Sequence, residues 1–363
     1  MNVDIQKGSC GLASWDRPSS TAWQVGSLKL MLGLSLVELL VSMALASILM
    51  LGILQIFSAS KRSFELTQDL SVLQEKGHLA ISTLAEHIQM ADYWGGVGAK
   101  SVFFGTRVLS TSRGDCSAEW LLQSSPSLVG FKGSGSVSGI ANFPDDCLRS
   151  EEYLPGSDLL LVRNSDGQAS IPDTTIDNKS QRKRYFVRSE VGGTAYVFQG
   201  RDSVSAFKKI PTNDMVHNRA LLANLFFLRP CSLVVNQICR DDIPTLVRLS
   251  LSGNRFVTQA LVEGIEQLHF SFGIDTDADQ TVDRYVSADL VPVWEHVISV
   301  QISLIVRSLE KDLSIDLSGK TYALGHEGGD SVNTFVVTDE GGQYRHRLFK
   351  REVVLRNRVY DPS

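Results

Sequence analysis

A long uninterrupted apolar stretch near the start of the chain restricts what this sequence can fold into. Residues 34–57 read LSLVELLVSMALASILMLGILQIF, with one charge, Glu38, and no proline. As an α-helix the stretch is about 36 Å long, enough to cross a hydrocarbon layer about 30 Å thick. A secretory signal peptide has a shorter apolar run and a cleavage site after it, and no A-x-A site follows Phe57. The sequence therefore predicts an anchored protein with most of its 363 residues on one side of a membrane.

Composition excludes two broad classes. The chain has 35 Lys and Arg against 40 Asp and Glu, a net charge of -5. This mild acidity lacks the electrostatic footprint of a nucleic-acid binder, so we expect no nucleic-acid partner. With 21% charged residues and 16 Phe, the chain has globular rather than disordered composition.

Glu38 is the one unusual residue of the apolar stretch. A carboxylate inside lipid costs up to about 3 kcal/mol, and less toward the interface. Two interpretations remain open from the residue alone. The side chain reaches water at the interface or is protonated, or it is retained because it meets a positive partner in an assembly.

The residues around Glu38 resemble the processing site of type IV prepilins. The motif is Gly33-Leu34-Ser35-Leu36-Val37-Glu38-Leu39-Leu40. The resemblance implies that a prepilin peptidase cuts after Gly33 and N-methylates Leu34, and that Glu38 pairs with the terminal amine of a neighbouring subunit. Two departures are that Leu34 replaces the usual Phe, and that the 33-residue leader is long and weakly basic.

The helix is predicted to continue beyond the membrane. Apolar residues recur at spacings of three and four, at Leu66, Leu70, Leu73, Ile81, Leu84 and Ile88. Gly77 weakens this pattern by about 1 kcal/mol relative to Ala. The glycines at 95, 96 and 98 end it. We expect a leader at 1–33 that is removed, a transmembrane or filament-core helix at 34–57, an amphipathic continuation at 58–91 and a β-rich periplasmic head at 92–363.

The head shows the pattern of a mainly antiparallel β protein. Strand-like runs occur at residues 158–163, 185–187, 195–198, 246–251 and 297–306. The last run alternates apolar and polar residues, which predicts a half-buried antiparallel strand. Loops are predicted at 133–139 and 174–184. The expected fold class is therefore α+β, a long helical spine packed on an antiparallel sheet, and this agrees with the pilin fold that the resemblance implies.

Three segments resemble one branch of the pilins, the large minor pilins of the PilW family. They are Gln89–Gly95, where the spine ends, Leu261–Phe270 with the acidic run after it, and Leu348–Asn357. The resemblance implies a minor pilin that helps to prime and cap the type IV pilus. Its implied partners are other minor pilins, the major pilin, the prepilin peptidase and the inner-membrane assembly platform. The implied location is the inner membrane, as a single-pass protein with a periplasmic head, and then the pilus tip.

The cysteines agree with an oxidising compartment. Cys10 lies in the leader, and its removal leaves an even number, at positions 116, 147, 231 and 239. Four cysteines allow three pairings, and sequence order favours Cys116–Cys147 and Cys231–Cys239. Free buried thiols are the alternative. A zinc site is disfavoured because the chain has no C-x-x-C pair.

An acidic run in the head offers a candidate calcium site. Asp275, Asp277, Asp279 and Asp283, with the Thr281 carbonyl, occupy positions that let a tight loop direct oxygens at one cation. Gln280 replaces the turn glycine of an EF-hand, and Val286 replaces its bidentate Glu. A solvated acidic hairpin is the equally open alternative.

Enzymatic signatures are weak throughout the chain, so we expect no catalytic residues. His326-Glu327 has no second His at zincin spacing, and Gly319-Lys320-Thr321 lacks the first glycine of a P-loop. Two other functions remain open. One is a pseudopilin of a type II secretion system, which shares the same N-terminal chemistry, and the other is a membrane-anchored periplasmic enzyme or binding protein.

Overall fold

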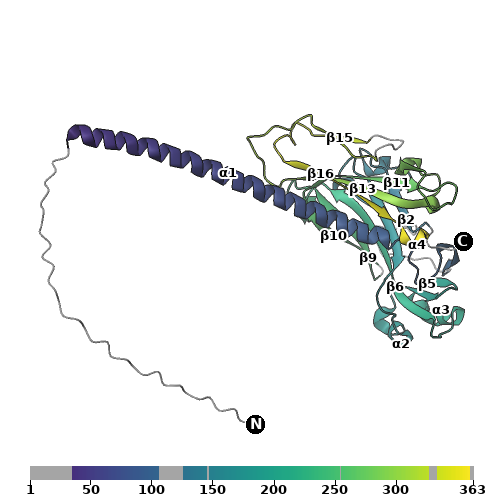
Figure 1. Ribbon diagram of the computed structural model, residues 1–363. Helices are drawn as coiled ribbons and strands as arrows, with labels where there is room; N and C mark the ends of the chain where they lie inside the picture. Colours follow the sequence, from purple (N-terminus) through teal and green to yellow (C-terminus); the bar gives the residue numbers. More distant parts are fainter. Residues whose placement is uncertain (1–34, 106–125, 145–146, 254, 327–332, 360–363) are drawn as a thin grey trace, which may run out of the picture. The chain divides into compact units, whose positions relative to one another are not determined.

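The structure is a computed structural model that describes residues 35–105, 126–144, 147–253, 255–326 and 333–359. Gly33, Leu34, Cys10 and Cys116 lie outside the described residues. The chain divides into two units, one up to Ser63 and one from Phe64 onward. The fold is α+β, with a long apolar helix near the start of the chain and a mostly antiparallel β head, as the sequence predicts (Figure 1).

The helix α1 runs from Leu36 to Gln89 without interruption. Up to Phe57 its large apolar side chains are exposed, as expected of a helix that has lipid or other helices as its surroundings. In the second unit, the predicted stripe is buried at Leu73, Ile81, Leu84 and Ile88. Leu66 and Leu70 are 37% and 39% exposed, so the stripe contacts the head only in its last part.

A large sheet forms one half of the head. Its strand order is β1-β5-β4-β6-β3-β2, with β9 on β6 and β10 on β9. All its pairs are antiparallel except β1 with β5. The strands are β1 Val102–Phe104, β2 Leu128–Phe131, β3 Leu159–Ser165, β4 Tyr185–Glu190, β5 Ala195–Gln199, β6 Val216–Arg229, β9 Thr245–Ser252 and β10 Arg255–Glu263.

A smaller antiparallel sheet forms the other half, in the order β12-β11-β13-β16. Its strands are β11 Ile265–Ile274, β12 Arg284–Ser287, β13 Val297–Arg307 and β16 His346–Val354. Two short hairpins complete the described strands, β7 Val234–Val235 with β8 Ile238–Cys239, and β14 Thr321–Ala323 with β15 Thr334–Val336.

Short helices fill the connections. The α-helices are α2 Asp173–Ile176, α3 Ser203–Lys209 and α4 Arg356–Val359. The 3-10 turns are η1 Ala99–Ser101, η3 Val137–Gly139, η4 Ser150–Glu152, η5 Lys179–Gln181, η6 Gly200–Asp202, η7 Ala288–Leu290 and η8 Trp294–His296. Both segments predicted as loops, 133–139 and 174–184, therefore contain a helical turn.

Three hydrophobic clusters of described residues stabilise the head, and two of them are large. The first joins the end of α1 to strands of both sheets, through residues such as Leu84, Phe226 and Ile302. The second lies within the large sheet and includes Trp94, Tyr185 and Phe227. Burial of this much apolar surface is the main stabilising contribution, at about 25 cal/mol per Å² removed from water.

One strand prediction needs correction. The run 297–306 was expected to be half-buried, and every one of its ten residues is buried in β13. The reason is that its polar residues find partners inside the head. Ser303 Oγ donates to the Leu324 carbonyl (2.6 Å), and the Tyr285 hydroxyl lies 2.7 Å from Ser299 Oγ. The alternation of polar and apolar residues in β13 therefore distinguishes two faces of the strand that are both buried, and neither is exposed to solvent.

Candidate functional site

The beginning of α1 carries the acid that the sequence singles out. Glu38 lies in the first turn of the helix and is exposed, like the apolar residues that follow it. A negative side chain there is favourable, because the first backbone N–H groups of a helix lack partners and carry partial positive charge. By length and composition α1 is long and apolar enough to cross a membrane, and its most apolar window is not buried in the protein.

The other end of α1 is capped by residues from the far end of the chain. The side-chain amide of Asn357 donates to the carbonyls of Gln89 (3.2 Å) and Ala91 (2.9 Å). The last carbonyls of a helix have no partners within it, so these bonds stabilise its terminus. Two segments that resemble the PilW family, Gln89–Gly95 and Leu348–Asn357, therefore meet at one place.

Asp92 is the centre of this junction. It is 6% exposed and has a φ of 62°, the left-handed conformation that commonly ends a helix. Its carboxylate accepts from Ser127 Oγ and pairs with Nε of Arg358. Arg358 also donates to the Trp294 carbonyl and, at 2.8 Å, to the carbonyl of Val297. The C-terminal helix α4 thus ties the end of α1 to the smaller sheet.

A second charge supports Asp92 from the large sheet. Arg163 of β3 is 2% exposed and donates to the Pro126 carbonyl (2.6 Å). Burial lowers the pKa of Arg163 to about 9, and the nearby Asp92 carboxylate opposes that shift. Opposite charges are needed here because a buried ion without a partner costs several kcal/mol.

Gly77 explains an apparent weakness in the spine. A Cβ atom at this position would lie 2.3 Å from Cε2 of Phe349 in β16, so the missing side chain lets that ring sit against the helix. The neighbouring His78 meets the same ring edge-on, with 5.6 Å between centroids. The sequence shows only a glycine that lowers helix propensity, whereas the structure shows a close contact between helix and strand.

His87, in the last turn of α1, lies against the large sheet. Its ring centroid is 5.1 Å from that of Phe226, and its Nε2 is 3.2 Å from Nη1 of Arg248. Burial, followed by the positive charge of Arg248, lowers the pKa of His87 to about 4. The imidazole is therefore neutral at neutral pH and accepts a hydrogen bond from the guanidinium.

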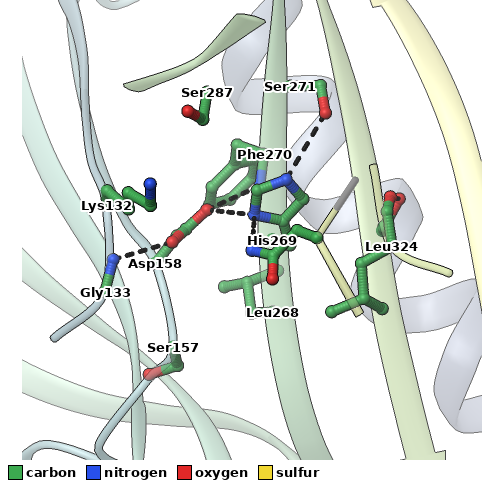
Figure 2. Close-up of polar contacts among 12 residues, drawn as sticks. Lys132, Gly133, Ser157, Asp158, Leu268, His269, Phe270, Ser271, Ser287 and Leu324 are labelled. Carbon is green, nitrogen blue, oxygen red and sulfur yellow. Dashed lines mark hydrogen bonds and ion pairs between the residues drawn. The ribbon is translucent and has the colours of Figure 1, made fainter. Parts of the chain in front are cut away.

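A buried polar cluster connects the two sheets (Figure 2). Asp158, just before β3, accepts from the backbone N–H groups of Gly133 (2.8 Å) and Phe270 (3.0 Å). The same carboxylate lies 2.7 Å from Nδ1 of His269 in β11, and both side chains are at most 3% exposed. One carboxylate thus satisfies donors from both halves of the head.

Ser271, His269 and Asp158 lie in the same sequence of contacts as the serine, histidine and aspartate of a serine hydrolase. The Ser271 Oγ lies 3.5 Å from Nε2 of His269, longer than the 2.6–3.2 Å expected for an activated nucleophile. Ser271 is 5% exposed and His269 1% exposed, so a substrate has no approach to either. We interpret the cluster as a structural connection between the sheets.

The acidic run forms the connection from β11 to β12. Ligand atoms of Asp275, Asp277 and Asp283 lie within 4.8 Å of one another. Asp279 is outside this group. The backbone also uses these carboxylates, because Asp275 accepts from the N–H groups at 278 (2.7 Å) and 280 (2.9 Å). The loop brings three of the four predicted acids together and stabilises them with its own amides, so calcium binding stays a prediction.

The disulfide described with both of its cysteines joins two that are consecutive in the sequence, as predicted. Cys231 and Cys239 are bonded, with 5.6 Å between their Cα atoms, and they close the β7–β8 hairpin. Cys147 is disulfide-bonded, and Cys116, the partner predicted for it, lies outside the described residues.

Several residues of the Asp92 junction and of the buried cluster between the sheets were not identified from sequence. Asn357 was noted only as the end of a motif, and Arg358, Arg163 and the Asp158–His269 pair were not predicted at all. Charged residues inside β strands were the available signal, since Arg163 interrupts the apolar run of β3. The sequence does not show which acid pairs with such a cation.

An apolar helix with an acid in its first turn and a mostly antiparallel β head are the α+β features that the resemblance to type IV pilins implies. Residues 234–357 match the family model of PilW, described as Type IV Pilus-assembly protein W. The match covers only part of the chain, and it supports a PilW-like type IV pilus protein that is involved in type IV pilus assembly. The match covers β7 to β16 and ends at Asn357. No curated protein and no solved structure matches the chain significantly.

Proposed function

We propose that this protein is a minor pilin of the type IV pilus, acting in the complex that primes assembly and occupies the tip. The proposed location is the inner membrane, with the head in the periplasm, before incorporation into the pilus. Proposed partners are other minor pilins, the major pilin, the prepilin peptidase and the assembly platform. A contribution to twitching motility or adhesion follows from this role.

The observations that carry the proposal are the exposed apolar side chains of α1 up to Phe57 and the match of residues 234–357 to the PilW family. These apolar side chains need lipid before assembly and neighbouring helices after it. Glu38 is proposed to pair with the N-methylated amine of Leu34 on a neighbouring subunit, after cleavage behind Gly33. In the apolar core of a filament, such a pair is favourable only if both groups are well aligned.

Glu38→Ala tests the role of this acid in assembly. We expect cleavage of the leader to proceed and incorporation into pili to fall, measured by immunoblots of membranes and of sheared pili. Glu86→Ala removes the same charge from the exposed face of the same helix and serves as the matched control. Normal amounts of the Glu38→Ala protein in pili would contradict the proposal.

N-terminal sequencing of the membrane-extracted protein separates the remaining alternatives. A mature chain that begins at methyl-Leu34 supports the prepilin processing, whereas an intact Met1 favours an anchored periplasmic enzyme or binding protein. Deletion of the gene distinguishes a pilus protein, whose loss impairs pili, from a pseudopilin, whose loss impairs secretion.

A further inference from the structure

The large sheet carries a cavity far in sequence from the spine. It has a volume of about 400 Å³ and opens where β4 begins, beside the middle of β6 and the end of β9. Its lining includes Arg184, Tyr185, Leu221, Leu251 and Ser252. The lining thus combines a cation, hydroxyl groups and aliphatic side chains, and it contains no acidic residue among those that the structure describes.

Positive charge is concentrated beside this cavity. Arg182, Lys183 and Arg184 are consecutive and exposed. Arg201 adjoins them, because its N–H donates to the Arg182 carbonyl (3.1 Å), but its own charge is paired with Asp202 (Nε to Oδ2, 3.7 Å). The Arg184 carbonyl accepts from the N–H of Gly200 (2.9 Å), which fixes the backbone of the run. The chain as a whole has a net charge of -5, so this basic run is a local exception.

The cavity wall also holds a polar group without a partner. The Tyr185 side chain is 2% exposed, and its hydroxyl has no hydrogen-bond partner among the described residues. A buried unsatisfied hydroxyl costs about 1–3 kcal/mol, and this one has no accessible surface, so Tyr185 forms part of the wall without offering its hydroxyl to a ligand. Burial raises the pKa of Tyr185, which keeps the hydroxyl protonated.

Arg184 retains most of its binding capacity. Among the described residues, its guanidinium makes one hydrogen bond, from Nη1 to Oε1 of Gln181 at 3.3 Å. A guanidinium has five N–H donors in a planar fork that matches a carboxylate. A small inorganic anion would fill little of this cavity and would leave Leu221 and Leu251 uncovered. A ligand with a carboxylate, hydroxyl groups and an apolar C–H face uses all three parts of the lining.

From these features we propose that the cavity beside Arg184 and Tyr185 is a binding site for an acidic sugar. The carboxylate binds the Arg184 fork, a sugar hydroxyl meets Ser252, and the C–H face of the ring packs on Leu221 and Leu251. This activity goes beyond assembly, because it gives the head a receptor function that does not depend on incorporation into a pilus.

Isothermal titration calorimetry on the full-length protein in detergent tests the site. The acidic probes are galacturonate, glucuronate and N-acetylneuraminate, and the comparisons are galactose and inorganic phosphate. We expect at least one acidic sugar to bind about tenfold more tightly than either comparison, because the carboxylate–guanidinium interaction is charge-assisted. Equal binding of galactose, equal or tighter binding of phosphate, or binding of none of the acidic sugars would overturn the proposal.

Variants locate the binding in the cavity. Arg184→Gln should weaken the acidic sugar about tenfold. Lys179→Gln removes the same charge from the same exposed segment outside the cavity lining, and it should change binding by less than about twofold. An equal loss in both variants would mean that only the general charge of the segment attracts the sugar, and would refute the site. Tyr185→Phe removes a buried hydroxyl without a partner among the described residues, so the thermal midpoint should stay equal or rise and binding should change by less than about twofold. A loss as large as that of Arg184→Gln would contradict the placement of the sugar on Arg184.

Discussion

Replacing Arg358 by Met removes the cation that pairs with the buried Asp92 at the end of the spine. The two side chains are 9% and 5% exposed, so water replaces the lost interaction poorly. Removing one partner of a buried ion pair costs about 3–5 kcal/mol. Arg163 remains near Asp92 and compensates in part, so we expect a loss of about 3 kcal/mol in the free energy of unfolding.

For a head of this size, about 3 kcal/mol corresponds to a decrease of roughly 6–12 °C in the midpoint of thermal unfolding. Circular dichroism of the full-length protein in detergent measures this midpoint. Hydrogen exchange of the last turn of α1 reports the junction itself and should increase. Arg356→Met is the matched control, because Arg356 lies two residues away in α4 and is exposed; we expect it to change stability by less than about 0.5 kcal/mol.

The double variant Asp92→Asn, Arg358→Met completes the test. If the pair interacts directly, the two single losses will not add, and the cycle will give a coupling free energy of about 1–3 kcal/mol. A loss below about 1 kcal/mol in Arg358→Met, or additive losses in the cycle, would refute the view that this pair fastens the spine to the head.

Three further predictions concern other contacts of the head. Because the pKa of His87 is about 4 in the folded protein and about 6.5 when unfolded, its contribution to stability should be complete above pH 6.5 and fall by about 3 kcal/mol by pH 4. Urea titrations of wild type and His87→Gln check this, and an unchanged pH dependence in the variant would contradict it. Gly77→Ala should destabilise the head by about 1 kcal/mol, since the clash with Phe349 exceeds the gain in helix propensity. Adding Phe349→Leu to Gly77→Ala should restore the lost stability. A Gly77→Ala protein more stable than wild type would show that the ring moves freely. Calcium at a hundred times its dissociation constant should stabilise the head by about 2.7 kcal/mol if the Asp275 loop binds it. Asp277→Asn should remove the resulting shift in the melting midpoint. An unchanged midpoint of the wild-type protein in calcium would exclude the metal site.

Much of the fold was predictable because it follows from local patterns. The strand-like runs at 158–163, 185–187, 195–198, 246–251 and 297–306 are β3, β4, β5, β9 and β13. The longest of the described strands, β6, was not predicted, since polar residues such as Asn218 and Arg219 interrupt its first half. Asn218 is buried there and donates to the Ile171 carbonyl at 3.0 Å, a partner that lies 47 positions away. A short window of sequence does not contain so distant a partner, so it cannot predict the contact.

The sequence alone determines that a helix suited to lipid lies near the start of the chain, that Glu38 lies in its first turn and that a β-rich head follows. These features depend on the periodicity and polarity of neighbouring residues, which act over a few turns or strand positions. Tertiary structure alone decides that Asn357 and Arg358 close the end of α1, that Gly77 makes room for Phe349 and that Asp158 joins two sheets. Each of these contacts stabilises the protein by pairing a buried group with one far along the chain, and only the folded arrangement of the strands brings the two together.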